Sequence, residues 1–158
     1  MTFRKLLLAA ALACVAAPLA IAQSQSAPDV QVEPYVPRLA DIMSGLQLRH
    51  LKLYFAARAQ NWDLADFELR QIRGGLADAA VLYSGLPVTN ITTLADPVQA
   101  LSDAIKTKDE RKFMAAFGQL TNGCNACHQT MDRKFIVIAQ PTGQPYITNQ
   151  VFTAPGRK

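Results

Sequence analysis

The stretch "KFMAAFGQLTNGCNACHQTM", residues 112–131, combines a helical pattern with two of the three cysteines of the chain. Its apolar and sulfur-bearing side chains recur at alternating steps of four and three, which places them on one face of an α-helix. The stretch therefore predicts an amphipathic helix whose buried face ends in a Cys-x-x-Cys-His motif. The residues of this stripe are Phe113, Phe117, Leu120, Cys124, Cys127 and Met131.

Two earlier segments repeat this rhythm. Residues 38–60, and the segment from Trp62 to about Tyr83, carry an apolar side chain at every third or fourth position and are predicted helices. We expect Gly74-Gly75 to interrupt the second helix and Gly85 to act as its C-cap. The stripes are Leu39, Met43, Leu46, His50, Leu53 and Ala57 on the first helix, and Ala65, Leu69, Ile72, Leu76, Ala79 and Tyr83 on the second.

Capping residues predict where two further helices begin. Asp96-Pro97 has the form of an N-cap followed by proline at the first helical position, and it opens a short third helix to about Lys106. Thr107 and Glu110 have the spacing of a capping box that opens the fourth helix. Four amphipathic helices with short connections, and no alternating strand pattern, predict an all-α fold, an antiparallel four-helix bundle.

The N-terminus has the pattern of an export signal. A basic pair precedes an apolar run from Leu6 to Ala17, and an A-x-A cleavage sequence ends at Ala22. We expect residues 1–22 to be a signal peptide and the mature protein to be periplasmic. The apolar run is shorter than the roughly 20 residues of a membrane span, so no transmembrane span is predicted. Cys14 leaves lipoprotein anchoring as an alternative.

The rest of the chain divides into three parts. Residues 23–37 carry three prolines and form an expected extended lead-in, residues 38–134 the bundle, and residues 135–158 an irregular tail. The tail either lies over the bundle or serves to recognise a partner. Loss of the basic pair in the leader lowers the formal charge from +4 to about +2, and no Lys or Arg cluster lies on a predicted helix face. A nucleic-acid partner is therefore not expected.

The motif at residues 124–128 has three chemical interpretations. A redox dithiol of the thioredoxin type starts a helix that follows a strand, whereas this pair lies near the end of a helix. A structural zinc site needs four ligands, and the mature chain offers only the two cysteines, His128 and His50. The motif supplies the groups that haem attachment requires, since two thiols at this spacing can add to the two vinyl groups of a haem and His128 can bind the iron. One covalent haem c is therefore expected, with a disulfide or zinc as alternatives.

A helical bundle of this size, whose single CxxCH motif lies near the end of its last helix, resembles the class II cytochromes c. These comprise cytochrome c′ and its low-spin relatives, and the resemblance covers residues 38–131. It implies that Cys124 and Cys127 hold the porphyrin and that His128 is the proximal iron ligand. It further implies a single-electron carrier between redox partner proteins rather than an enzyme, and pairing of two chains through the first two helices.

The ligand on the other side of the iron has three candidates, Met43, Gln47 and His50. Low-spin members of the class have a methionine near the start of the first helix, whereas cytochrome c′ leaves that position open. In an antiparallel bundle the start of the first helix lies beside the end of the fourth. At 1.5 Å per residue, His50 lies about 10 Å further along the axis than Met43. Topology thus favours Met43 as the distal ligand and His50 as a core or haem-edge residue, with bis-histidine ligation as the alternative.

An open distal position would imply a different function. The protein would then be a five-coordinate haem protein that binds a small gas such as NO or CO, or that acts in peroxide chemistry. Three basic residues near the same end of the bundle are candidates to pair with haem propionates: Arg38, Arg133 and Lys134.

The first helix has a second apolar stripe formed by Leu48, Leu51 and Phe55. At 100° per residue this stripe lies nearly opposite Met43 and His50. A bundle helix needs only one apolar face. We therefore expect the second stripe to be covered by the tail or by another subunit.

Overall fold

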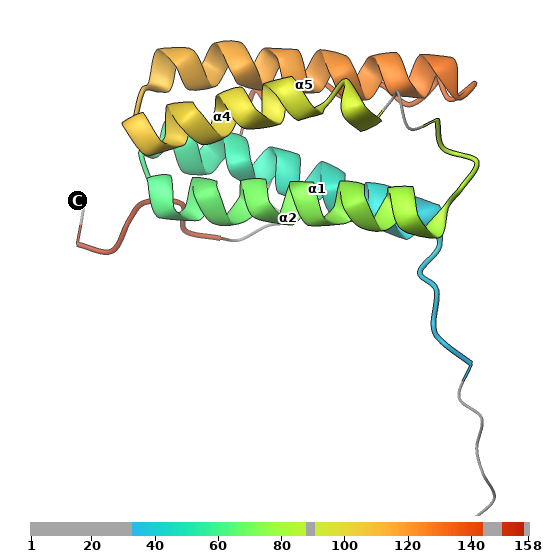
Figure 1. Cartoon of the computed structure of the whole chain (residues 1–158). Helices are drawn as coiled ribbons and strands as arrows, with labels where there is room; N and C mark the ends of the chain where they lie inside the picture. Colours follow the sequence, from blue (N-terminus) through green and yellow to red (C-terminus); the bar gives the residue numbers. More distant parts are fainter. Residues whose placement is uncertain (1–32, 88–90, 144–149, 157–158) are drawn as a thin grey trace, which may run out of the picture. The chain divides into compact units, whose positions relative to one another are not determined.

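The computed structural model describes residues 33–87, 91–143 and 150–156 (Figure 1). The predicted signal peptide and most of the lead-in lie outside these residues. Every regular element in the described part is an α-helix, which confirms the all-α prediction. None of the helices described there combines the length and hydropathy of a membrane span.

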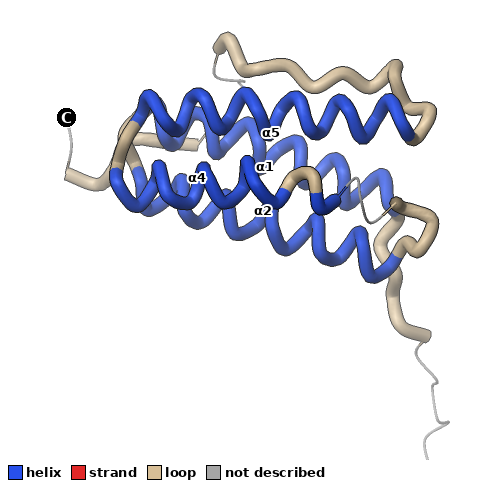
Figure 2. The backbone as a smooth tube through the Cα atoms, turned by 45° about the horizontal axis from the view of Figure 1, so that its top comes forward, coloured by secondary structure: helices blue, strands red, loops and turns tan. Residues whose placement is uncertain are grey.

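The four helices form two antiparallel pairs. α1 (Leu39–Arg58) packs on α2 (Trp62–Leu82), and α4 (Ala95–Thr107) packs on α5 (Glu110–Thr130). α2 also packs against α4, whereas α1 and α5 meet only sparsely. Each connection reverses the chain, so α1 begins at the end of the bundle where α5 ends (Figure 1, Figure 2). The predicted antiparallel four-helix bundle is confirmed.

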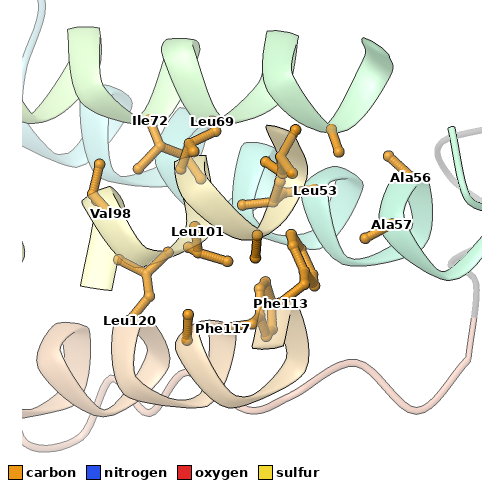
Figure 3. Close-up of a cluster of buried hydrophobic side chains, with 14 of the residues drawn as sticks. Leu53, Ala56, Ala57, Leu69, Ile72, Val98, Leu101, Phe113, Phe117 and Leu120 are labelled. Atoms are coloured by element: carbon orange, nitrogen blue, oxygen red, sulfur yellow. The ribbon is translucent and has the colours of Figure 1, made fainter. Parts of the chain in front are cut away.

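The first half of the α5 stripe supplies the centre of the core. The rings of Phe113 and Phe117 stack with their centroids 5.9 Å apart, and burial of each stabilises the fold by roughly 2–3 kcal/mol. From Cys124 onward the stripe is only half-buried. The largest fully buried apolar side chains come from all four helices: Leu53, Leu69, Leu101, Phe113, Phe117 and Leu120 (Figure 3).

The glycines of α2 do not act as predicted. The helix continues through Gly74-Gly75 without interruption and ends at Leu82. Tyr83 follows with φ of −127°, and Gly85 does not have a left-handed φ, so the expected glycine C-cap is absent. Gly75 instead allows close approach of α1, because a Cβ at this position would lie 2.7 Å from Cδ2 of Leu46.

α4 begins before the predicted cap. Leu94 is the N-cap residue, so Asp96 and Pro97 lie inside the first turn. Both residues suit that position, because an acidic side chain there complements the helix dipole and a first-turn proline removes no intrahelical hydrogen bond.

The predicted capping box of α5 is also wrong. Lys108 adopts a left-handed conformation with φ of 54°, which ends α4 after Thr107 rather than before it. The N-cap of α5 is Asp109, whose Oδ1 accepts a 3.0 Å hydrogen bond from the backbone N–H of Lys112. Because Thr107 is the last residue of α4, its hydroxyl donates to the carbonyl of Asp103 at 2.9 Å.

After α5 the chain reverses in a Schellman motif. The N–H of Arg133 donates to the carbonyl of His128 at 2.7 Å, and the N–H of Asp132 donates to that of Gln129 at 3.3 Å. This hydrogen-bond pair is typical of a helix whose following residue is left-handed, and Asp132 has φ of 55°. Residues 133–143 then run back along α5 (Figure 2).

The last described segment, residues 150–156, covers one end of the second apolar stripe. Phe152 is buried and its ring centroid lies 5.7 Å from that of Phe55. Nδ2 of Asn61 donates to the carbonyl of Phe152 at 3.0 Å. Leu48, at the other end of the stripe, is 42% exposed. The tail therefore covers the Phe55 end of the stripe and leaves the Leu48 end open.

A buried carboxylate joins α1 to α2. Glu68 is fully buried. Nη1 of Arg49 donates to its Oε2 at 3.2 Å. Nζ of Lys52 lies 3.1 Å from its Oε1 and forms an ion pair without hydrogen-bonding geometry. Two cations thus balance one buried anion, a pairing that the apolar stripes did not predict.

Glu68→Ala is expected to lower the free energy of unfolding by about 3 kcal/mol, since it leaves the mostly buried cations Arg49 and Lys52 without their anion. Asp66→Ala is the matched control, because Asp66 lies on the same helix and forms an exposed ion pair with Arg70. Its expected cost is below about 1 kcal/mol. Urea unfolding measures both, and equal costs for the two variants would contradict the importance of the buried pair.

Candidate functional site

A cavity of about 490 Å³ lies at the end of the bundle where α1 begins and α5 ends. All four residues expected at the site, Met43, Cys124, Cys127 and His128, line it. The other lining residues are mainly aliphatic, and α1 and α5, whose mutual contact is sparse, form facing walls. The volume is within the roughly 300–1,000 Å³ typical of small-molecule and cofactor sites.

The two cysteines occupy adjacent turns of α5. Both are half-buried, and their spacing places them on one helix face together with His128. Burial, with a smaller effect of the neighbouring Cys127, raises the pKa of Cys124 to about 11. Cys124 is therefore a neutral thiol at pH 7, whereas the attacking cysteine of a dithiol oxidoreductase has a lowered pKa.

The ring of His128 is held by the segment that follows α5. Nδ1 lies 2.8 Å from the carbonyl oxygen of Ile136. Because a carbonyl can only accept, Nδ1 carries the proton of this hydrogen bond. In the neutral imidazole, Nε2 is then the nitrogen with the free lone pair. Histidines that bind metals usually donate their other ring N–H in this way.

Met43 and His50 both lie on the α1 wall. Met43 is half-buried near the start of the helix, and His50 is buried two turns further on. Gln47, the third candidate, lies between them and also lines the cavity. The start of α1 and the end of α5 thus line the same cavity, as the antiparallel topology predicts. All three candidate ligands on α1 lie on its wall, so the hydrogen bonds of His50 are needed to distinguish them.

His50 is part of a hydrogen-bonded chain in the core. Its Nε2 lies 2.8 Å from Oγ1 of Thr121, and this hydroxyl donates its single proton to the carbonyl of Phe117 at 2.9 Å. Nε2 of His50 must therefore be the donor to Thr121. The imidazole also packs on the ring of Phe117, with centroids 4.3 Å apart. These contacts are those of a core histidine at the edge of the cavity.

Of the three basic residues expected near this end, one lines the cavity. Arg133 is a lining residue and donates to the carbonyls of Met131 and Asp132. Arg38 pairs instead with Asp41, with Nε and Oδ2 2.9 Å apart. Lys134 is exposed.

Several lining residues were not predicted from the sequence. Ile136 and Ile138 contribute to the wall from the segment after α5, and Leu94 contributes from the residue before α4. Leu94 also packs against the backbone of Gly123, where a Cβ would lie 2.4 Å from its Cδ2. Met131, the C-cap residue of α5, lines the cavity as well.

The described residues do not form a ligand cluster for zinc. No group of three or more His, Cys, Asp or Glu side chains in that part of the chain is placed to hold a metal ion. A structural zinc site has four ligands. Of the lining side chains that could bind a metal, Cys124, Cys127 and His128 belong to α5, whereas Met43 and His50 belong to α1.

Comparisons with known proteins give no match. No protein-family model matches the chain, and neither a curated protein nor a solved structure is significantly similar to it. The function of the chain is therefore inferred from the chemistry of the cavity.

The buried His50 makes folding sensitive to acid. Burial lowers the pKa of His50 from 6.5 to about 4, so the unfolded chain binds a proton that the folded chain excludes between these values. The stabilisation is complete above pH 6.5 and is lost as the pH falls through 4, which amounts to about 3 kcal/mol. We expect His50→Gln to remove this part of the pH dependence of the unfolding free energy.

Urea unfolding between pH 7 and pH 4 measures this effect. Carboxylates titrate in the same way in both proteins, so the difference between wild type and variant isolates His50. Equal acid sensitivity of wild type and His50→Gln would contradict the assignment.

Proposed function

We propose that the mature chain is an exported monohaem c-type cytochrome, related in design to the class II cytochromes c, that carries single electrons between redox partner proteins. The observation that carries this proposal is that one cavity is lined by Met43, from the first helix of the bundle, and by Cys124, Cys127 and His128, from the last. A covalently bound haem supplies the one-electron iron couple. The chain itself supplies attachment, ligation and an apolar enclosure.

The α5 residues have distinct roles in this proposal. The thiols of Cys124 and Cys127 form the thioether bonds, and His128 is the proximal ligand through Nε2. Two properties of the site support these roles. Cys124 is a neutral thiol rather than an activated thiolate, and the hydrogen bond to Ile136 leaves the lone pair on Nε2 of His128.

Met43 is the proposed distal ligand. A distal ligand approaches from the side opposite His128, and Met43 belongs to the facing wall on α1. Met131 is the C-cap of α5, only three residues after His128, which places it on the proximal side. His50 already uses Nε2 to donate to Thr121, so ligation through that nitrogen would require the loss of a buried hydrogen bond.

The walls of the cavity suit an electron carrier. Aliphatic side chains dominate the lining, and they lower the local dielectric constant around the iron. A thioether ligand raises the reduction potential relative to a second histidine. Arg133 is the cation placed to pair with a propionate, since it is the basic residue of the three candidates that lines the cavity.

The partners follow from the same proposal. The export signal predicted for residues 1–22 directs the chain to the periplasm, where c-type haem is attached in bacteria, and redox proteins there are its electron donors and acceptors. A homodimer through α1 and α2 is supported by the exposed apolar side chains on both helices. Leu48 and Phe67 are each 42% exposed.

Absorption spectra of the protein purified from a periplasmic expression host test the function. In the wild type we expect covalent haem with a low-spin spectrum that CO does not change. In Cys124→Ala we expect no haem attached through two thioether bonds. Met43→Ala is expected to become high-spin and to bind CO, because it loses the sixth ligand. Met131→Ala is the matched control, and its spectrum is expected to stay low-spin.

Two results would contradict this proposal. A wild type without covalent haem would exclude the cytochrome. A high-spin wild type that binds CO readily would exclude Met43 as a ligand and favour gas binding or peroxide chemistry in its place.

A further inference from the structure

The segment at residues 133–138, here called the strap, forms one wall of the cavity. From Phe135 to Ile138 its side chains alternate in exposure. Ile136, which is 41% exposed, and Ile138 line the cavity, whereas Phe135 and Val137 are 75% and 72% exposed. The strap begins with a turn, since the N–H of Ile136 donates to the carbonyl of Arg133 at 2.8 Å. A slip of one residue along α5 would exchange the more and the less exposed side chains.

Asn125 fixes the strap to α5. Its Nδ2 donates to the carbonyl of Ile138 at 2.8 Å, and its Oδ1 accepts from the N–H of the same residue, also at 2.8 Å. Both edges of one side-chain amide thus bind both backbone groups of one strap residue. An aspartate would lose the donor, and an alanine would lose both bonds.

The same strap holds His128. The carbonyl of Ile136 accepts from Nδ1 of His128 at 2.8 Å. Ile136 and Ile138 are two residues apart on the strap, and His128 and Asn125 are three residues apart on α5. The strap runs antiparallel to the helix, so the two attachments lie side by side and share one register.

We propose that Asn125, one of the two residues between the haem-attachment cysteines, is a positioning residue that holds the strap in the register at which the Ile136 carbonyl accepts from Nδ1 of His128. The Schellman turn at Asp132 reverses the chain, and the Asn125 amide then fixes where the reversed chain lies. The inference rests on the proposed function for its consequence, because donation from Nδ1 makes an imidazole a more basic iron ligand. The attachment itself is a property of the chain.

Nuclear magnetic resonance of the purified mature chain tests the proposal without a measurement of activity. In the wild type we expect slow hydrogen exchange at the Ile138 amide and a slowly exchanging proton on Nδ1 of His128, detected with ¹⁵N-labelled histidine. In Asn125→Ala both are expected to exchange at least about tenfold faster, since both hydrogen bonds of the amide are lost. Asn125→Asp keeps only the acceptor and should fall between the two.

Asn122→Ala is the matched control. Asn122 is an exposed asparagine one turn earlier on α5, and its replacement should leave both signals protected. The proposal is overturned if the Ile138 amide exchanges freely in the wild type. It is equally overturned if Asn125→Ala frees the Ile138 amide but leaves the Nδ1 proton of His128 protected, because Asn125 would then hold the strap without positioning the histidine.

The reduction potential extends the test to the haem protein. Loss of the Nδ1 hydrogen bond makes His128 a weaker donor to the ferric state, so Asn125→Ala should raise the potential, whereas Asn122→Ala should not change it. A lowered or unchanged potential in Asn125→Ala would contradict the proposed effect on the ligand. If the wild type carries no haem, the proposed function fails, but the two exchange measurements still decide whether Asn125 positions His128.

Discussion

Burial of one face of α5 is the constraint on which the rest of the structure depends. Its first half, with Phe113 and Phe117, packs into the centre of the bundle and fixes the rotation of the helix about its axis. The same rotation then turns Cys124, Cys127 and His128 toward the opening where α1 begins. One helical stripe thus serves as core at one end and as cavity wall at the other. The antiparallel topology supplies the facing wall, which includes Met43.

The periodic part of this design could be predicted from the sequence, and the local part could not. The stripes determine which faces are buried, so the four helices and the approach of α1 to the end of α5 follow from the spacing of apolar residues. Helix ends depend on single backbone conformations. Lys108 and Asp132 adopt left-handed φ values without being glycine, so neither turn had a glycine signal, and the buried charge of Glu68 depends on two cations from another helix.

The strap shows the same division. Residues 135–138 are all apolar, which hides the alternation that only contact with α5 creates. Asn125 could not be identified from its type, because its partners are backbone groups 13 residues away. The consequence reaches the chemistry, since the carbonyl of Ile136 determines which nitrogen of His128 is free to bind a metal. The fold and the tautomer of His128 are therefore linked through a segment that lacks regular secondary structure.

The most direct test of the central claim, that the cavity holds a haem between His128 and Met43, is the ¹³C-methyl spectrum of the reduced protein with labelled methionine. Apart from Met1, the sequence has three methionines, Met43, Met114 and Met131. When the sulfur of a methionine binds the iron, its methyl group lies over the porphyrin ring and the methyl resonance is shifted strongly upfield. We expect this shift for one methyl resonance, and its loss in Met43→Leu. Three methyl resonances at ordinary positions, or an upfield resonance that persists in Met43→Leu, would contradict the claim.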